Sequence, residues 1–154
     1  EAGGGGEAYV QRLRATLEGV PADIAGPQFD PGALAAEYRA ATLFCYPSLA
    51  EKGESFGLAA LEAMACGTPP LVSSLECFRD FVSEGRTGWV FDHRGADPEA
   101  ALAKALEAAM ADPGRALEAG RRASAAARKI GYAEVAESYL ADFRQLLEEA
   151  ARDA

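Results

Sequence analysis

The sequence has little of what marks disulfide-rich, metal-binding or membrane-spanning proteins. Its 154 residues include three cysteines and one histidine. An odd number of cysteines without Cys-x-x-Cys spacing favours neither a disulfide framework nor a zinc site. No apolar run approaches the roughly 20 residues that span a bilayer. The first ten residues also lack the basic start and apolar stretch of a signal peptide.

Basic residues are scarce as well. The formal net charge is −9, which argues against binding nucleic acid or anionic membrane across the whole surface. A local anion site stays open, because backbone N–H groups at a helix start can hold phosphate without a basic side chain. Cys45 and Cys66 lie among apolar or small residues. We therefore expect reduced core cysteines and a reducing, cytoplasmic location.

What the chain does have is an alternation of short apolar runs and helical patterns. Residues 1–21 predict a flexible glycine-rich start at residues 3–6 and a helix over residues 7–18. Residues 22–96 predict strands and helices in turn, and residues 97–154 predict helices alone. The predicted strands cover residues 22–26, 42–46, 69–73 and 89–91, and the predicted helices cover residues 31–40, 56–65, 77–82, 98–111, 113–129 and 132–150. This order predicts an α/β fold, with a Rossmann-like parallel sheet flanked by helices.

Residues 54–67 carry the candidate chemistry. In a parallel sheet, ligands bind beyond the carboxyl ends of the strands, where loops lead into helices. The helix predicted to start near Phe56 would point unpaired N–H groups and partial positive charge at that edge. Gly57 lets a ligand approach the backbone closely. A pyrophosphate fits such a site.

Glu54 and Glu62 flank this predicted helix start. Carboxylates on either side of a phosphate site make sense as acceptors for hydroxyl groups, and a sugar nucleotide has that layout of ribose, pyrophosphate and sugar. Two glutamates eight residues apart also occur often by chance, and most are simply solvated. Glu62 lies in an otherwise apolar helix, so we expect it to need a partner.

The run EKGESFGLAALEAMACGTP, residues 51–69, resembles the signature of the retaining GT-B glycosyltransferases called group 1 or family 4. That family carries an E-x7-E motif, which falls here on Glu54 and Glu62. The resemblance continues through Tyr46-Pro47-Ser48, a G-x-T-G turn at residues 85–88, and Asp97-Pro98-Glu99. It also includes the last helix, and it covers roughly residues 22–150.

The resemblance implies the donor-binding, C-terminal half of a GT-B enzyme. Glu54 would be catalytic, contacting the transferred sugar or stabilising charge near its anomeric carbon, and Glu62 would bind the donor ribose. The remaining implied donor contacts are Ser55, Phe56, Gly57 and Leu58 for sugar and phosphate, and Gly26 and Pro27 for the base. The donor would be a UDP-, GDP- or ADP-sugar, with no cofactor and no metal, since the sequence has no Asp-x-Asp motif.

The sequence departs from the family pattern in two places. Residues 73–80 replace the usual Gly-Gly turn and following Glu. The first βαβ unit, with its pyrophosphate-binding Arg and Lys, and the N-terminal acceptor domain have no counterpart upstream of residue 22. We therefore expect one partial domain over residues 1–154 that is inactive without its N-terminal domain.

Two other interpretations of the whole chain stay open. It would be a non-catalytic nucleotide-binding or interaction module if it bound nucleotide without turnover. A GT-B sugar-nucleotide epimerase is the other alternative, although its pattern would not normally include this E-x7-E helix.

Among the remaining residues, we expect His93 to be an exposed polar side chain and Trp89 to pack in the core. The basic stripe of Arg121, Arg122, Arg128 and Lys129 is expected to be a solvated helix face, with peripheral contact to the inner membrane as its other interpretation.

Overall fold

The computed structural model describes residues 6–152. Residues 3–5 of the predicted flexible start lie outside them. The chain divides into two compact units, and the boundary along the chain falls between Asp30 and Pro31. The prediction of one partial domain over residues 1–154 stays a prediction.

The first unit contains one helix. Helix α1, Gly6–Thr16, confirms the helix predicted here, and the chain then turns through Gly19, whose φ is +80°. The strand predicted over residues 22–26 is wrong. Residues 18–30 are all exposed and no described strand pairs with them, so their few apolar side chains have no ladder and no core to join.

The second unit is built on a parallel sheet of three strands, in the order β1-β2-β3. The strands are β1, Phe44–Tyr46; β2, Pro70–Ser73; and β3, Trp89–Phe91. Three of the four predicted strands are therefore confirmed, and so is the α/β fold. Pro70 fits in the central strand because it is the first residue, where a missing N–H does least damage to the ladder.

The strand β2 separates two apolar clusters. Its side chains alternate across the sheet, so that Val72 packs in one cluster with Met64 and Phe78, while Leu71 packs in the other with Trp89. All four residues of β2 are buried. The edge strand β1 is covered less well. Cys45, predicted to be a core residue, is exposed, because its strand has a neighbour on one side only among the described residues.

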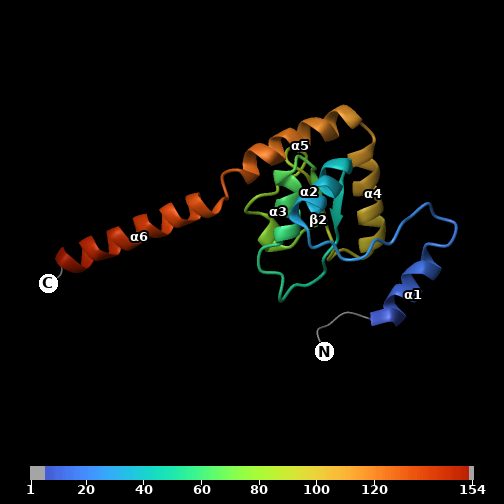
Figure 1. The fold of residues 1–154 in the computed structure, drawn as a ribbon, viewed down its shortest axis with the longest axis horizontal. Coiled ribbons are helices and arrows are strands. Elements are labelled where there is room, and N and C mark those ends of the chain that lie inside the picture. Colours follow the sequence, from blue (N-terminus) through green and yellow to red (C-terminus); the bar gives the residue numbers. More distant parts are fainter. Residues whose placement is uncertain (1–5, 153–154) are drawn as a thin grey trace. The chain divides into compact units, whose positions relative to one another are not determined.

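Helices α2 to α5 pack around the sheet, and α6 extends away from it (Figure 1). Their bounds are α2, Pro31–Ala40; α3, Leu58–Ala65; α4, Pro98–Met110; α5, Pro113–Ala127; and α6, Tyr132–Arg152. Asp97 and Asp112 cap α4 and α5, as each side chain accepts a hydrogen bond from a backbone N–H of the first turn. The helix predicted over residues 77–82 is wrong. Only a 3-10 turn forms, η1, Glu76–Phe78, followed by tight turns that bury Phe81 and Val82.

Small residues let α5 pack closely on the end of α3. A Cβ on Gly120 would stand 2.1 Å from the carbonyl oxygen of Gly67. The Ser124 hydroxyl donates to the carbonyl of Ala65 at 3.2 Å. Ala116 and Ala119 then join one apolar cluster, and Ala123 and Ala127 the other. The position of α3 is therefore fixed from its C-terminal end.

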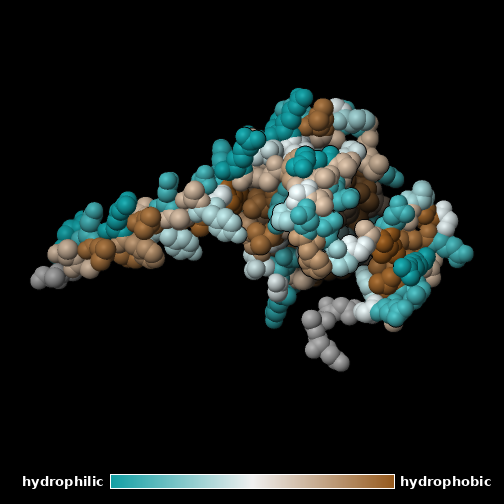
Figure 2. Space-filling model, in the orientation of Figure 1, coloured by the Kyte–Doolittle hydropathy of each residue, from teal (hydrophilic) through white to brown (hydrophobic). Residues whose placement is uncertain are grey.

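Helix α6 is amphipathic, and none of its residues is buried. Tyr139, Phe143 and Leu146 lie on the predicted apolar face and are each more than half exposed. Figure 2 shows apolar side chains along this helix. In residues 6–152, no helix has the length and apolar character needed to cross a membrane.

Candidate functional site

The carboxyl ends of β1, β2 and β3 lie at one edge of the sheet, because the strands are parallel. The loop of residues 47–57 leaves β1 at this edge and leads into α3. Ser74 follows β2, and residues 92–95 follow β3. The candidate residues Glu54, Ser55, Phe56 and Gly57 belong to the first of these segments, and Leu58 is the first residue of α3.

Gly57 sets where α3 begins. Its φ of 72° and ψ of 50° are left-handed, so it caps the helix from outside, and the first helical residue is Leu58. The predicted start near Phe56 is therefore two residues too early, since a left-handed residue cannot continue a right-handed helix. The carbonyl of Gly57 accepts the N–H of Ala60 at 3.0 Å. The N–H groups of Leu58 and Ala59 precede the first intrahelical bond and face the start of the helix.

A side chain at position 57 would collide with the core. A Cβ on Gly57 would stand 2.4 Å from Cε1 of Phe78, whose side chain is fully buried. Phe56, just before it, packs its ring on Phe81 with centroids 5.3 Å apart. Position 57 is itself buried and has no room for a side chain, while Ser55, two residues earlier, is exposed.

Glu54 is half-buried and held by one tyrosine. The Tyr46 hydroxyl, at the end of β1, donates to Oε2 of Glu54 at 2.8 Å. This hydrogen bond raises the pKa of Tyr46, and burial and the carboxylate charge raise it further. The contact fixes one carboxylate oxygen and leaves Oε1 without a hydrogen-bond partner among residues 6–152.

Glu62 is exposed rather than enclosed by its apolar sequence neighbours, although it has the hydrogen-bond partner that we expect. The apolar residues around it in sequence, Ala63 and Met64, turn to the core while Glu62 turns outward. It does have a neighbour, because the Tyr38 hydroxyl donates to its Oε2 at 3.4 Å. Burial raises the pKa of Tyr38, and the charge of Glu62 raises it further. Both groups line a shallow, largely apolar pocket of about 240 Å³ between α2 and α3.

Gly26 and Pro27, predicted to line a base pocket, lie in the first unit, in an exposed segment without regular structure. Their assignment stays a prediction. The described part of the chain contains no group of three or more His, Cys, Asp or Glu side chains placed to hold a metal ion.

One cluster at this edge escapes the sequence analysis. The His93 side chain is only 4% exposed, so its prediction as an exposed residue is wrong. Its Nε2 lies 2.8 Å from Oε1 of Glu51, and its Nδ1 lies 3.1 Å from Oγ of Ser74. Arg94 contacts the same carboxylate through Nε at 2.7 Å and Nη2 at 2.9 Å. It also donates to the carbonyl of Ser74 at 2.9 Å.

This cluster, which we call the Glu51 latch, ties the loop that carries Glu54 to the ends of β2 and β3. The hydrogen bonds from Arg94, and then those from His93, lower the pKa of Glu51. The latch joins residues more than 40 positions apart. One signal in the sequence could have predicted this cluster: polar residues that directly follow neighbouring parallel strands lie at the same edge of the sheet.

Comparisons with known proteins identify the family and the fold. A model of the family described as glycosyl transferases group 1 matches residues 2–130. The D-inositol 3-phosphate glycosyltransferase of Kribbella flavida is 39% identical over 122 residues, which make up 79% of this chain and 27% of that protein. A phosphatidyl-myo-inositol mannosyltransferase of Mycobacterium leprae is 42% identical over 81 residues, 53% of this chain and 20% of that protein.

Solved structures share the fold. A sucrose-phosphate synthase from Thermosynechococcus elongatus superposes with a TM-score of 0.73 at 29% identity, over 92% of this chain and 35% of that one. HepE from Anabaena, solved in complex with UDP and glucose, gives a TM-score of 0.65 at 22% identity, over 80% of this chain and 32% of that one. The chain spans about a quarter of the length of the curated relatives it matches.

Proposed function

We propose that this chain, which belongs to the glycosyl transferases of group 1, binds a nucleoside-diphosphate sugar at the start of α3 for retaining glycosyl transfer. The observation that carries the proposal is the helix start itself. Gly57 precedes the first residue of α3 and has no side chain. It lies in sequence between a carboxylate held by a tyrosine before the helix and a second, outward-facing carboxylate within the helix. A neighbour of the same fold that was solved with UDP-glucose supports a UDP-sugar among the three candidate donors.

In this proposal the helix start receives the pyrophosphate. The unpaired N–H groups of Leu58 and Ala59 donate to phosphate oxygens, and the partial positive charge of the helix end stabilises the leaving diphosphate. No basic side chain is needed for this step. Ser55 and the backbone of Phe56 extend the same contact surface toward the sugar.

The two carboxylates take the hydroxyl groups on either side. Glu62 accepts from the ribose hydroxyls through the oxygen that Tyr38 leaves unused. Glu54 faces the transferred sugar and stabilises positive charge that develops near its anomeric carbon. The Tyr46 hydroxyl fixes the direction of Glu54, so the charge is in place before the donor binds.

None of the residues assigned above to the donor is assigned to the acceptor. We propose that an acceptor-binding N-terminal domain of the same protein is the partner that completes the enzyme, and that the donor binds without a metal or other cofactor. The cytoplasmic location and contact with the inner membrane also stay proposals.

Calorimetry on the purified chain with UDP-glucose, GDP-mannose and ADP-glucose tests donor binding. Loss of hydrogen bonds to a charged group costs about 1.5–3 kcal/mol, so Glu62→Gln is expected to weaken binding roughly 10- to 100-fold. Glu137→Gln, at an exposed position of α6, is the matched control and is expected to bind like the unchanged chain. If the unchanged chain, Glu62→Gln and Glu137→Gln bind every donor with equal affinity, the assignment of Glu62 to the donor site is refuted.

Transfer itself is tested by adding the acceptor-binding domain and following release of nucleoside diphosphate. Glu54→Gln is expected to abolish transfer while donor binding persists. Binding without release in the complete protein would favour the non-catalytic module instead.

A further inference from the structure

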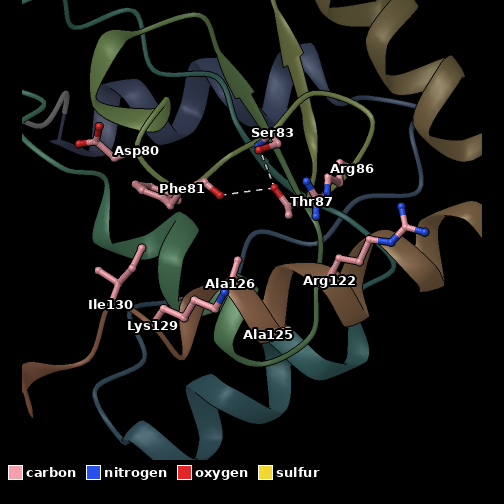
Figure 3. Close-up of a pocket in the computed structure, with 10 residues that line it drawn as sticks. All are labelled: Asp80, Phe81, Ser83, Arg86, Thr87, Arg122, Ala125, Ala126, Lys129 and Ile130. Atoms are coloured by element: carbon pink, nitrogen blue, oxygen red, sulfur yellow. Dashed lines mark hydrogen bonds between the residues drawn. The ribbon is translucent and has the colours of Figure 1, made fainter. Parts of the chain in front are cut away.

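A second pocket lies between the turn that leads into β3 and the C-terminal half of α5 with the residues that follow it (Figure 3). Its volume is about 430 Å³, within the range of small-molecule sites. None of the residues assigned to the donor lines it. Its walls come from two separate parts of the chain, residues 80–87 and residues 122–130.

Three cations line this pocket, which we call the basic pocket. In Figure 3, Arg86 extends from the turn on one side, and Arg122 and Lys129 belong to the segment opposite. One carboxylate, that of Asp80, stands at the end of the pocket. A local excess of positive charge is unusual in a chain whose formal net charge is −9.

These three cations keep N–H donors that make no hydrogen bond within residues 6–152. Arg122 pairs with Glu118 through Nε at 3.0 Å, which orients the guanidinium on α5 but leaves its two terminal nitrogens unused. Arg86 and Lys129 make no ion pair or side-chain hydrogen bond with any residue between 6 and 152. Arg122 has a carboxylate partner in Glu118, whereas the charges of Arg86 and Lys129 are left unpaired within residues 6–152, and unpaired positive groups favour an anion.

The wall that carries Arg86 is pre-formed. The backbone N–H groups of Arg86 and Thr87 both donate to the carbonyl of Ser83 at 3.0 Å. The N–H of Ser83 donates in turn to the Thr87 hydroxyl at 2.8 Å, and that hydroxyl donates to the carbonyl of Phe81. The turn is therefore closed by its own hydrogen bonds, and little order has to be gained when a ligand binds.

The other part of the lining is apolar. Phe81, Ala126 and Ile130 line the pocket beside the cations, and Phe81 is anchored in the core through Phe78 and Phe56. A simple inorganic anion would leave this surface uncovered. A ligand that fits both parts carries a phosphate group joined to an apolar group.

We propose that the basic pocket binds a phosphate ester with an adjoining apolar group. Arg86 and Arg122 are suited to the phosphate because a guanidinium can donate two parallel hydrogen bonds to it, and Lys129 adds a point charge. A soluble phosphate ester and the head of an anionic phospholipid share this chemistry. The proposal does not depend on donor binding at α3, because the two sets of residues do not overlap.

The test compares two double variants of the purified chain with equal changes in charge. Arg86→Gln with Lys129→Gln removes cations from the basic pocket. Arg121→Gln with Arg128→Gln removes two cations from the same helix region, outside the lining. All four positions are exposed, and thermal melts followed by circular dichroism check that both variants fold.

Two probes distinguish the sources. Phenyl phosphate, with phenol as its control, is titrated by calorimetry, and flotation is measured with phosphatidylcholine vesicles that contain or lack phosphatidic acid. The pocket variant is expected to lose about 10- to 100-fold in affinity for the probe that binds, because it loses two charge-assisted contacts. The matched variant is expected to lose about threefold or less, since Arg121 and Arg128 do not line the pocket and exposed charges are screened by salt.

Pocket-dependent binding of phenyl phosphate alone assigns a soluble ester, and pocket-dependent flotation with phosphatidic acid assigns a lipid headgroup. Equal losses in the two double variants would reduce the effect to diffuse surface charge and overturn the proposal. Absence of binding to both probes, with UDP-glucose still bound at α3, would overturn it as well and leave the proposed function intact.

Discussion

Replacing Gly57 by alanine tests how the start of α3 is built. Two effects act together at this position. The left-handed backbone, at φ 72°, disfavours any residue with a Cβ, and the added Cβ would stand 2.4 Å from the ring of Phe78. Phe78 is 1% exposed and packed among Tyr46 and Phe81, so its ring cannot move aside without disturbing the core.

The size of the loss follows from these two effects. A left-handed conformation costs a residue with a Cβ roughly 1–2 kcal/mol. Overpacking of a well-filled core typically costs a further 1–3 kcal/mol. We therefore expect Gly57→Ala to lower the free energy of unfolding by about 2–5 kcal/mol, a large part of the roughly 5–15 kcal/mol of a typical domain.

Gly67→Ala is the matched control, at the other end of the same helix. Gly67 is also left-handed, at φ 89°, but nothing lies within 4 Å of an added Cβ. This variant should lose only the backbone contribution, about 1–2 kcal/mol. Its difference from Gly57→Ala isolates the contact with Phe78.

Urea unfolding followed by the fluorescence of Trp89, the chain's one tryptophan and 2% exposed, measures both variants. With a urea m-value of roughly 1–3 kcal/mol/M, the midpoint of Gly57→Ala should fall by about 1 M or more. If Gly57→Ala and Gly67→Ala unfold at the same midpoint, the steric argument is refuted. If neither differs from the unchanged chain, the left-handed assignment is refuted too.

Three further predictions concern the parts around this site. Arg94→Gln should release the loop of residues 48–55, and mass spectrometry should then detect faster tryptic cleavage after Lys52. Tyr46→Phe should make the free energy of unfolding fall less steeply at alkaline pH. The pKa of Tyr46 is raised in the folded state, so its contribution to stability is fully present below about pH 10 and is lost as the pH rises through the folded-state pKa. Gly120→Ala should destabilise the fold despite alanine's helix propensity, which alone would favour it by about 1 kcal/mol, because its Cβ would meet a backbone carbonyl.

Each of these has its own check. Arg79→Gln removes another exposed ion pair and should leave cleavage after Lys52 unchanged. Tyr132→Phe, at a tyrosine that is 97% exposed, should leave the alkaline limb as it is. A gain in stability for Gly120→Ala would mean that α5 does not approach α3 as closely as described.

The sequence predicts this fold well where the signals are local. Asp97 and Asp112 stand directly before Pro98 and Pro113, and each pair marks a helix start that the structure confirms. The strand at residues 89–91 is predicted to the residue, because turns on both sides of this short apolar run mark where it begins and ends.

Properties that depend on neighbours are predicted less well. Cys45 has a core-like sequence context, but its exposure depends on which strand pairs beside it. His93 is surrounded by polar residues in sequence and is buried by Glu51, which lies 42 positions away. Glu62 shows the reverse of His93. Its neighbours in sequence are apolar, but the helix turns them to the core and turns Glu62 to the surface. The Phe78 ring leaves no room for a side chain at Gly57, and no local pattern in the sequence reveals this contact.

The Glu51 latch has a consequence for how the site opens. It bridges the segments after β1 and β3 across the end of β2, so the three strand ends share one set of hydrogen bonds. Segments joined in this way open together rather than one at a time. Amide hydrogens of residues 48–55 and 92–95 should therefore exchange with a common opening free energy. Glu54 would then be mobile or fixed together with its loop, although Glu54 makes none of the contacts of the latch.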